Sequence, residues 1–187
     1  QQEKLERRIL KVATQLARRC GGLPVSVVTV ARASREDSLL EEWKDALRRF
    51  KIFDKDGPAE KAKLAIEWSY NRLKGDELRP LFLLCGVIAG RSYSISLSDL
   101  FKYSMGLGLI KNVDTVEDAR NSLHALAAKL KNSCLLLDSY DNSTVRMHEL
   151  VRDVAIWVAS DDKNAFSKAY GDEVKEWPTE DFLKKCT

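Results

Sequence analysis

The sequence predicts a mainly helical chain, in which a small helical bundle is followed by a winged-helix domain with a small β-hairpin. Three observations lead to this prediction. Over most of the 187 residues, apolar side chains recur at spacings of three and four, as they do on one face of a helix. Residues 54–58 form a turn-rich break between two such regions. Between residues 133 and 147 the pattern changes to two short strands around a turn.

The first expected helix covers residues 3–20, because the apolar side chains of this segment share one helical face. Gly21 and Gly22 end this helix, and Pro24 suits the first turn of the element that follows. Residues 24–33 are apolar and rich in β-branched side chains, so propensity alone leaves them open between helix and strand. We expect them to form a short buried segment before a polar loop.

Three further helices are expected around the break. Residues 38–51 carry apolar side chains at helical spacing, with Ser38 as the N-cap and Glu41 completing a capping box. Residues 59–73 and 76–89 follow the break, and the second of these segments is strongly apolar.

Two capped helices are expected in the second half of the chain. The first covers residues 98–109 and is predicted to be capped by Ser98. The second covers residues 115–131, with Thr115 and Asp118 as a capping pair.

Two strands are then expected to pair as a β-hairpin, and the helical pattern returns after them. Helices followed by a two-stranded wing are the layout of a winged-helix domain, which is an inference about fold alone. The strands cover residues 133–138 and 144–147, and the helix covers 148–159. The expected domains are a bundle over 1–58, a winged helix over 59–160 and a linker over 161–187.

Charge, hydropathy and cysteine spacing narrow the classes of function. The net charge is +3, with 31 basic and 28 acidic residues, which is too balanced to indicate nucleic acid as a partner. No apolar run approaches the ~20 residues that span a bilayer, and no secretory signal is visible. The four cysteines lie far apart without a CxxC pair, so we expect no zinc site and a reducing compartment.

Conventional catalytic motifs are also missing from the sequence. Of the two histidines, His124 lies in an apolar helical pattern and is interpreted as structural. Residues 86–92 superficially suggest a phosphate loop, but Arg91 replaces the lysine and the second glycine comes one residue early. We therefore reject that match. The helix over 115–131 carries a net charge of only +1, which argues against a DNA-recognition helix.

Four short stretches, in this order along the chain, resemble the nucleotide-binding NB-ARC region of plant intracellular immune receptors. The resemblance is to the class with an N-terminal coiled coil and C-terminal leucine-rich repeats, and it covers about residues 1–160. One motif alone would be weak, but four in order are specific. They are CGGLPVSV at 20–27, WSYNRL at 68–73, PLFLLC at 80–85 and VRMHELVRDVA at 145–155.

The resemblance implies a fold and a site. In this family a helical first ARC subdomain and a winged-helix second ARC subdomain hold ADP against an upstream P-loop subdomain. The proline of the Gly-Leu-Pro motif, here Pro24 after Gly22 and Leu23, packs on adenine. The histidine of the Met-His-Asp motif, here His148, bonds the ADP β-phosphate, and its neighbours Met147 and Glu149 are associated with the switch.

Two departures from the family pattern stand out. The Met-His-Asp motif ends in Glu149, whose side chain is one carbon longer, and the Gly-Leu-Pro-Leu motif ends in Val25. The chain also begins at Gln1, from which we expect a fragment of a larger receptor that lacks the P-loop. We accordingly expect no enzyme activity, no bound metal and negligible nucleotide affinity for these 187 residues alone, and a slow P-loop ATPase in the full-length parent.

The resemblance also implies partners and a location. The ADP or ATP would be shared with the upstream P-loop subdomain, and leucine-rich repeats would follow downstream. A pathogen effector or a guarded host protein would be the external partner, with an oligomer on activation, no nucleic acid, and a cytoplasmic location. Two alternatives remain open. One is a nucleotide-independent helical interaction module from a truncated receptor, and the other is a winged-helix DNA binder.

Overall fold

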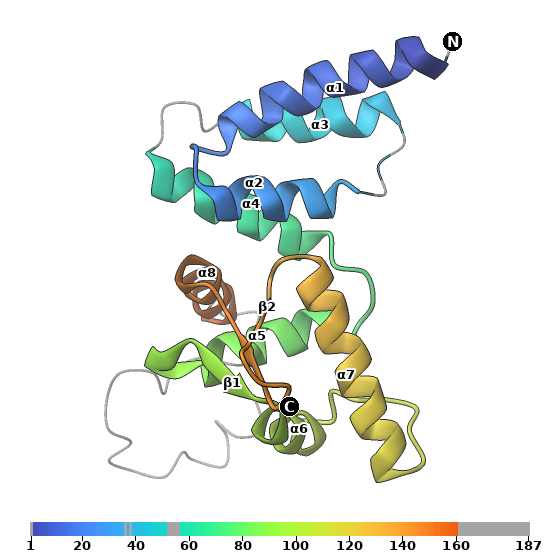
Figure 1. The fold of residues 1–187 in the computed structure, drawn as a ribbon, viewed down its shortest axis with the longest axis vertical. Helices are drawn as coiled ribbons and strands as arrows, with labels where there is room; N and C mark the ends of the chain where they lie inside the picture. The colour runs from blue at the N-terminus through green and yellow to red at the C-terminus, as the bar shows by residue number, and fades with distance from the viewer. Residues whose placement is uncertain (1, 36, 38, 52–56, 161–187) are drawn as a thin grey trace. The chain divides into compact units, whose positions relative to one another are not determined.

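The chain folds into two compact units, which are described in a computed structural model. Within the described residues the chain is mainly helical and has one small antiparallel sheet, so the predicted fold class is confirmed (Figure 1). The units are Gln1–Leu73 and Lys74–Thr187, and the described residues are 2–35, 37, 39–51 and 57–160.

The first unit is a bundle of four helices. Helix α1 packs against α3, and α2 packs against α4 (Figure 1). Phe50 and Trp68 meet edge to face in its core, with ring centroids 5.9 Å apart. The helices are α1 (Gln2–Arg19), α2 (Pro24–Ala33), α3 (Leu40–Lys51) and α4 (Pro58–Asn71). The buried core consists of Leu16, Cys20, Val30, Ala46, Phe50, Ala65 and Trp68.

Two local features of this unit differ from the prediction or go beyond it. The segment that propensity left open is the helix α2, and the hydroxyl of its buried Thr29 donates to the carbonyl of Val25 at 2.8 Å. The predicted N-cap Ser38 lies outside the described residues. The carboxylate of Glu42, rather than that of Glu41, accepts a hydrogen bond from the backbone N–H of Leu39 at 3.1 Å.

The division between the units lies further along the chain than the predicted boundary at residue 58. Gly57 is the N-cap of α4 and Pro58 is its first residue, so this turn lies inside the first unit. The division falls between Leu73 and Lys74. Turn residues mark the start of a helix, but unit membership depends on packing, and α4 packs along α2 and contributes to the bundle core.

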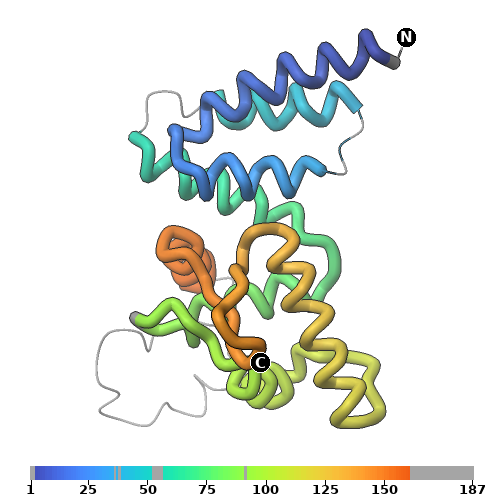
Figure 2. The backbone as a smooth tube through the Cα atoms, in the orientation of Figure 1, coloured from blue at the N-terminus to red at the C-terminus, as the bar shows by residue number. Residues whose placement is uncertain are grey.

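The second unit has the element order of a winged helix. A helix, a strand, two helices and two strands follow one another, and a last helix closes the unit (Figure 1). The colours of Figure 2, from green to orange, trace the course of the backbone through this unit. The strands are antiparallel and lie in the spatial order β1-β3-β2. The elements are α5 (Leu78–Ile88), the 3₁₀ turn η1 (Gly90–Ser92), β1 (Ser94–Ser96), α6 (Leu97–Gly106), α7 (Val116–Asn132), β2 (Leu137–Asp138), β3 (Thr144–Arg146) and α8 (Glu149–Ala159).

The predicted hairpin exists, but its strands are shorter than expected and a third strand joins them. Strand β1 pairs with β3 so that Ile95 lies opposite Val145, and both side chains are buried. Strand β2 pairs on the other side of β3, with Asp138 opposite Val145. Strand β1 is not among the predicted elements, because a strand of three residues is too short to show a period of two.

Of the two helix caps predicted for the second unit, one is wrong and one is confirmed. Helix α6 is capped by Ser96, whose hydroxyl accepts from the N–H of Asp99 at 3.3 Å, and not by Ser98. The hydroxyl of Thr115 accepts from the N–H of Asp118 at 3.0 Å, which confirms the predicted cap of α7.

Close packing explains one glycine of the rejected phosphate-loop match. Gly86 lies within α5, where a Cβ atom would come within 2.4 Å of the Cβ atom of Ala155 in α8. The glycine therefore allows two helices to approach each other, and it sits in no loop that could surround a phosphate.

Two further predictions concern membrane-spanning segments and the linker at the end of the chain. None of the helices in the described part combines the length and the apolarity that crossing a membrane requires. The predicted linker over 161–187 lies outside the described residues.

Candidate functional site

The Gly-Leu-Pro stretch forms a tight corner between α1 and α2. Gly21 and Gly22 have φ angles of +73° and +74°, a left-handed backbone that suits glycine. A Cβ atom on Gly21 would lie 3.3 Å from the Cα atom of Pro58, so a larger residue at this position would also crowd Pro58. Leu23 is the extended N-cap residue and Pro24 the first residue of α2. Pro24 is exposed, so its ring is accessible to a flat ligand.

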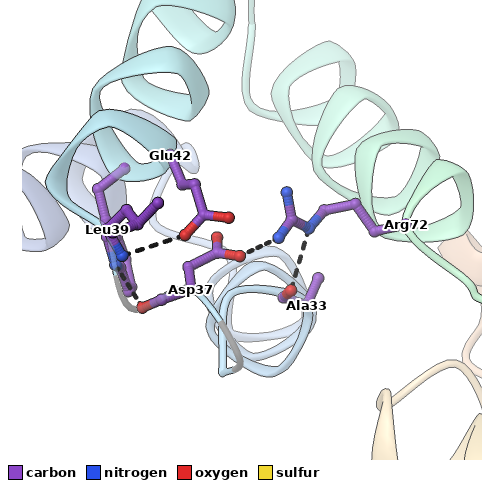
Figure 3. A network of polar contacts seen from close by, with 6 residues as sticks. Ala33, Asp37, Leu39, Glu42 and Arg72 are labelled. Atoms are coloured by element: carbon purple, nitrogen blue, oxygen red, sulfur yellow. Dashed lines mark hydrogen bonds and ion pairs between the residues drawn. The ribbon is translucent and has the colours of Figure 1, made fainter.

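The other end of α2 is held by a polar network that the sequence analysis did not anticipate (Figure 3). Arg72, at the end of α4, donates from Nε to the carbonyl oxygen of Ala33 at 3.1 Å and forms an ion pair with the Asp37 carboxylate. The Asp37 side chain is only 3% exposed, and its backbone carbonyl accepts from Trp43 Nε1 at 3.1 Å. No motif flags Asp37, which lies in a polar loop.

The same arginine connects this network to the core of the bundle. Its guanidinium carbon lies 4.7 Å from the ring centroid of Trp68, which is a cation–π distance. Arg72 belongs to the WSYNRL stretch, whose Ser69 is buried and donates to the carbonyl of Ala65 at 2.8 Å. This stretch therefore anchors α2, the helix that carries Pro24 at its first position.

His148 lies at the corner between strand β3 and helix α8. Its backbone has φ −67° and ψ 142°, which is the extended conformation of an N-cap residue. Its Nδ1 atom accepts a hydrogen bond from the backbone N–H of Leu150 at 3.1 Å. A neutral imidazole that accepts at Nδ1 carries its proton on Nε2, so the exposed ring presents an Nε2–H donor beside the N-terminus of α8.

The two sequence neighbours of His148 differ in burial, since Met147 is buried and Glu149 is exposed. Met147 is 2% exposed, and its N–H donates to the carbonyl oxygen of Tyr93 at 2.9 Å. Glu149 is exposed and is the first residue of α8. Arg152 stands one turn further along α8, and its guanidinium carbon lies 5.5 Å from the ring centroid of Tyr93. Tyr93 is a residue of this corner that the sequence analysis missed.

The predicted site residues thus form two contiguous sets. Gly22, Leu23 and Pro24 lie together in the first unit, and the Met147–Glu149 run lies together in the second. Both sets sit where one element ends and a helix begins, with an exposed residue at the corner.

Two further kinds of chemistry can be examined in the described part of the chain, metal binding and the reactivity of the two buried cysteines. No group of three or more His, Cys, Asp and Glu side chains there could hold a metal ion. Burial raises the pKa of the Cys20 thiol to about 11 and that of the Cys85 thiol to about 12. Both are therefore protonated and unreactive at neutral pH.

Comparison with known proteins relates the chain to a family in Arabidopsis thaliana. Probable disease resistance protein At4g27220 is 33% identical over 178 residues, which cover 92% of this chain and 19% of that protein. Disease resistance protein At4g27190 is 32% identical over 157 residues, which cover 81% of this chain and 15% of that protein. The chain belongs to the plant disease resistance proteins.

A further member of this family shows the same partial coverage. Disease resistance protein RPS5 is 29% identical over 153 residues, which cover 80% of this chain and 17% of that protein. The disease resistance chain described here therefore spans between 15% and 19% of the length of these relatives. No family model matches it.

Proposed function

We propose that this chain is the ADP/ATP-dependent switch module of a plant immune receptor, with an upstream P-loop subdomain supplying the rest of the nucleotide site. In this proposal Pro24, with Gly22 and Leu23 before it, faces the adenine, and His148 donates a hydrogen bond to the β-phosphate of ADP. The observation that carries the proposal is the geometry of His148, whose Nδ1 atom is engaged by Leu150 while Nε2–H remains as a donor.

The position of this donor suits a phosphate for two reasons. The N-terminal end of a helix carries partial positive charge and backbone N–H groups, which favour an anion. A hydrogen bond between an imidazole N–H and a charged phosphate contributes about 1.5–3 kcal/mol. Since His148 caps α8, the ring is already oriented before a ligand arrives, which lowers the entropic cost of binding.

This bond would make the nucleotide a switch. In this proposal His148 stabilises the closed state through its bond to the β-phosphate of ADP, and exchange of ADP for ATP breaks that bond. A ligand shifts a conformational equilibrium by its difference in affinity for the two states. The loss of one bond of about 2 kcal/mol is a shift of roughly thirtyfold in the equilibrium between the two states.

The test uses a longer chain that includes the upstream P-loop segment expected from the resemblance. His148→Ala removes the donor, and we expect ADP affinity to fall by about tenfold or more, with faster nucleotide exchange. Isothermal titration and release of a fluorescent ADP analogue measure the two effects. The control is His124→Ala, which removes the other histidine, exposed on α7 and distant in sequence from the corner.

The proposal is wrong if His148→Ala binds and releases ADP as the unchanged chain does. The alternative of a nucleotide-independent interaction module would then be preferred.

DNA binding is the less favoured alternative, because two cations of α7 are already engaged. Arg120 lies over the ring of Phe101 at 4.7 Å, and Lys131 forms an ion pair with Asp138 at 2.8 Å. A salt-dependent mobility shift of DNA by the 187-residue chain would favour it nonetheless.

A further inference from the structure

The second unit contains a cleft of about 230 Å³ between α6, α7 and the turn that joins β2 to β3. The turn and the start of α6 are tied together at this place, because the backbone N–H of Leu97 donates to the carbonyl oxygen of Ser143 at 2.9 Å. None of the residues proposed to contact the nucleotide lines the cleft. An inference about the cleft is therefore independent of the proposed function.

The lining of the cleft is amphipathic. Its apolar side chains are the more buried ones, and its polar side chains are exposed. The apolar lining consists of Leu97, Phe101 and Leu123, and the polar lining includes Ser98, Arg120 and Asn142. Ligand sites combine a mainly apolar surface with a few polar groups that fix the orientation of the ligand, and this cleft has both.

Arg120 supplies the charge of the cleft. Its guanidinium carbon lies 4.7 Å from the ring centroid of Phe101, so the cation is held over a side chain that lines the cleft. Stacking uses the face of the guanidinium and leaves the N–H groups in its plane for an acceptor. Among the described residues no carboxylate forms an ion pair with Arg120, whereas Lys131 on the same helix pairs with Asp138 at 2.8 Å.

Two carboxylates near the cleft are bound by other groups. Asp99, in the first turn of α6, pairs with Lys102 at 3.0 Å. Asp141 accepts hydrogen bonds from the hydroxyl groups of Ser143 and Thr144, both at 2.9 Å, and these bonds lower the pKa of Asp141 below its ordinary value. The chain itself thus provides Arg120 with a ring but with no counter-ion in the described part.

We propose that this cleft binds a small organic acid, whose carboxylate hydrogen-bonds Arg120 and whose apolar body packs on Phe101 and Leu123. The planar guanidinium can donate two parallel hydrogen bonds to a carboxylate. The apolar lining favours an acid that carries a hydrocarbon group over a bare inorganic anion. Sites for drug-sized ligands measure about 300–1,000 Å³, so a cleft of about 230 Å³ suits a ligand with one ring.

The test is an NMR titration of the 187-residue chain with phenylacetate, which has one ring and one carboxylate. We expect saturable shifts of the amide signals of Phe101, Leu123 and Asn142, which surround the cleft. The neutral analogue 2-phenylethanol should bind about tenfold more weakly because it lacks the charge. Acetate should also bind more weakly, because it lacks the ring. Shifts that do not saturate, or that lie mainly outside the cleft, would refute the site.

Two variants test the role of the arginine. Arg120→Gln should lower the affinity for phenylacetate about tenfold and abolish the preference for phenylacetate over 2-phenylethanol. Lys129→Gln is the matched control, since it removes an exposed cation of α7 that does not line the cleft, and it should leave the affinity unchanged. Circular dichroism verifies that both variants are folded. If Arg120→Gln binds phenylacetate as tightly as the unchanged chain, or if both variants weaken binding equally, the proposal is wrong.

Discussion

Gly86→Ala is expected to destabilise the second unit, although alanine is the better helix former. Gly86 lies in the interior of α5, where replacing glycine by alanine favours the helix by about 1 kcal/mol. In the folded unit the new Cβ atom would lie 2.4 Å from the Cβ atom of Ala155 on α8. Two effects of opposite sign therefore compete, and their sizes decide the outcome.

The clash is the larger effect. Carbon atoms that are not bonded pack at about 3.5–4.0 Å, so α5 and α8 would have to separate by more than about 1 Å. Since both helices are buried along this contact, separation disturbs the main helix pair of the unit. Overpacking of this kind costs about 1–3 kcal/mol, and after subtracting the gain in propensity of about 1 kcal/mol we expect a net loss of up to about 2 kcal/mol.

Urea denaturation of the 187-residue chain, followed by circular dichroism, measures the loss. The matched control is Gly106→Ala at the end of α6, where a Cβ atom would meet nothing within 4 Å, and we expect no loss of stability there. Adding Ala155→Gly to Gly86→Ala removes the opposing methyl group and should relieve the clash. The packing argument is refuted if Gly86→Ala alone unfolds at the same or a higher urea concentration than the unchanged chain.

Two further predictions follow from the polar contacts. Arg72→Met removes the ion pair to the buried Asp37 carboxylate and should lower the unfolding free energy by about 1–3 kcal/mol. Arg48→Met breaks an exposed pair and should cost less than about 1 kcal/mol, so equal losses in urea denaturation would contradict this prediction. Ser96→Ala removes the cap of α6 and should lower the unfolding free energy by about 1 kcal/mol, while Ser98→Ala should change thermal stability little. A larger loss for Ser98→Ala than for Ser96→Ala would instead support Ser98, the cap predicted from sequence.

Local signals in the sequence predicted much of the fold. The pair Thr115 and Asp118 marked the start of α7 correctly, because a cap is formed within four residues. The glycines at 21 and 22 marked the corner before α2, because a left-handed backbone suits few other residues. His148 was singled out through the motif it belongs to, and its place at a strand-to-helix corner is confirmed.

Other features depend on partners far away in the sequence. Strand β1 exists because Ile95 packs opposite Val145, fifty residues later, and three residues carry no visible period. The unit boundary lies after Leu73 because α4 packs on α2, whereas the turn before α4 looked like a break. The Ser96 cap shifted from the predicted Ser98 because β1 ends directly at α6.

The sequence by itself determined where most helices lie, the mainly helical fold class and the two short motifs at helix starts. Only the tertiary structure decided what surrounds these motifs and the helices that carry them: Arg72 and Asp37 behind α2, Ala155 against Gly86, and Tyr93 beside Met147 and Arg152. The physical reason is the separation along the sequence between the residues that make each interaction. Helical periodicity and caps arise from neighbours within about four residues, whereas close packing, buried ion pairs and the surroundings of a side chain depend on which distant segments fold together.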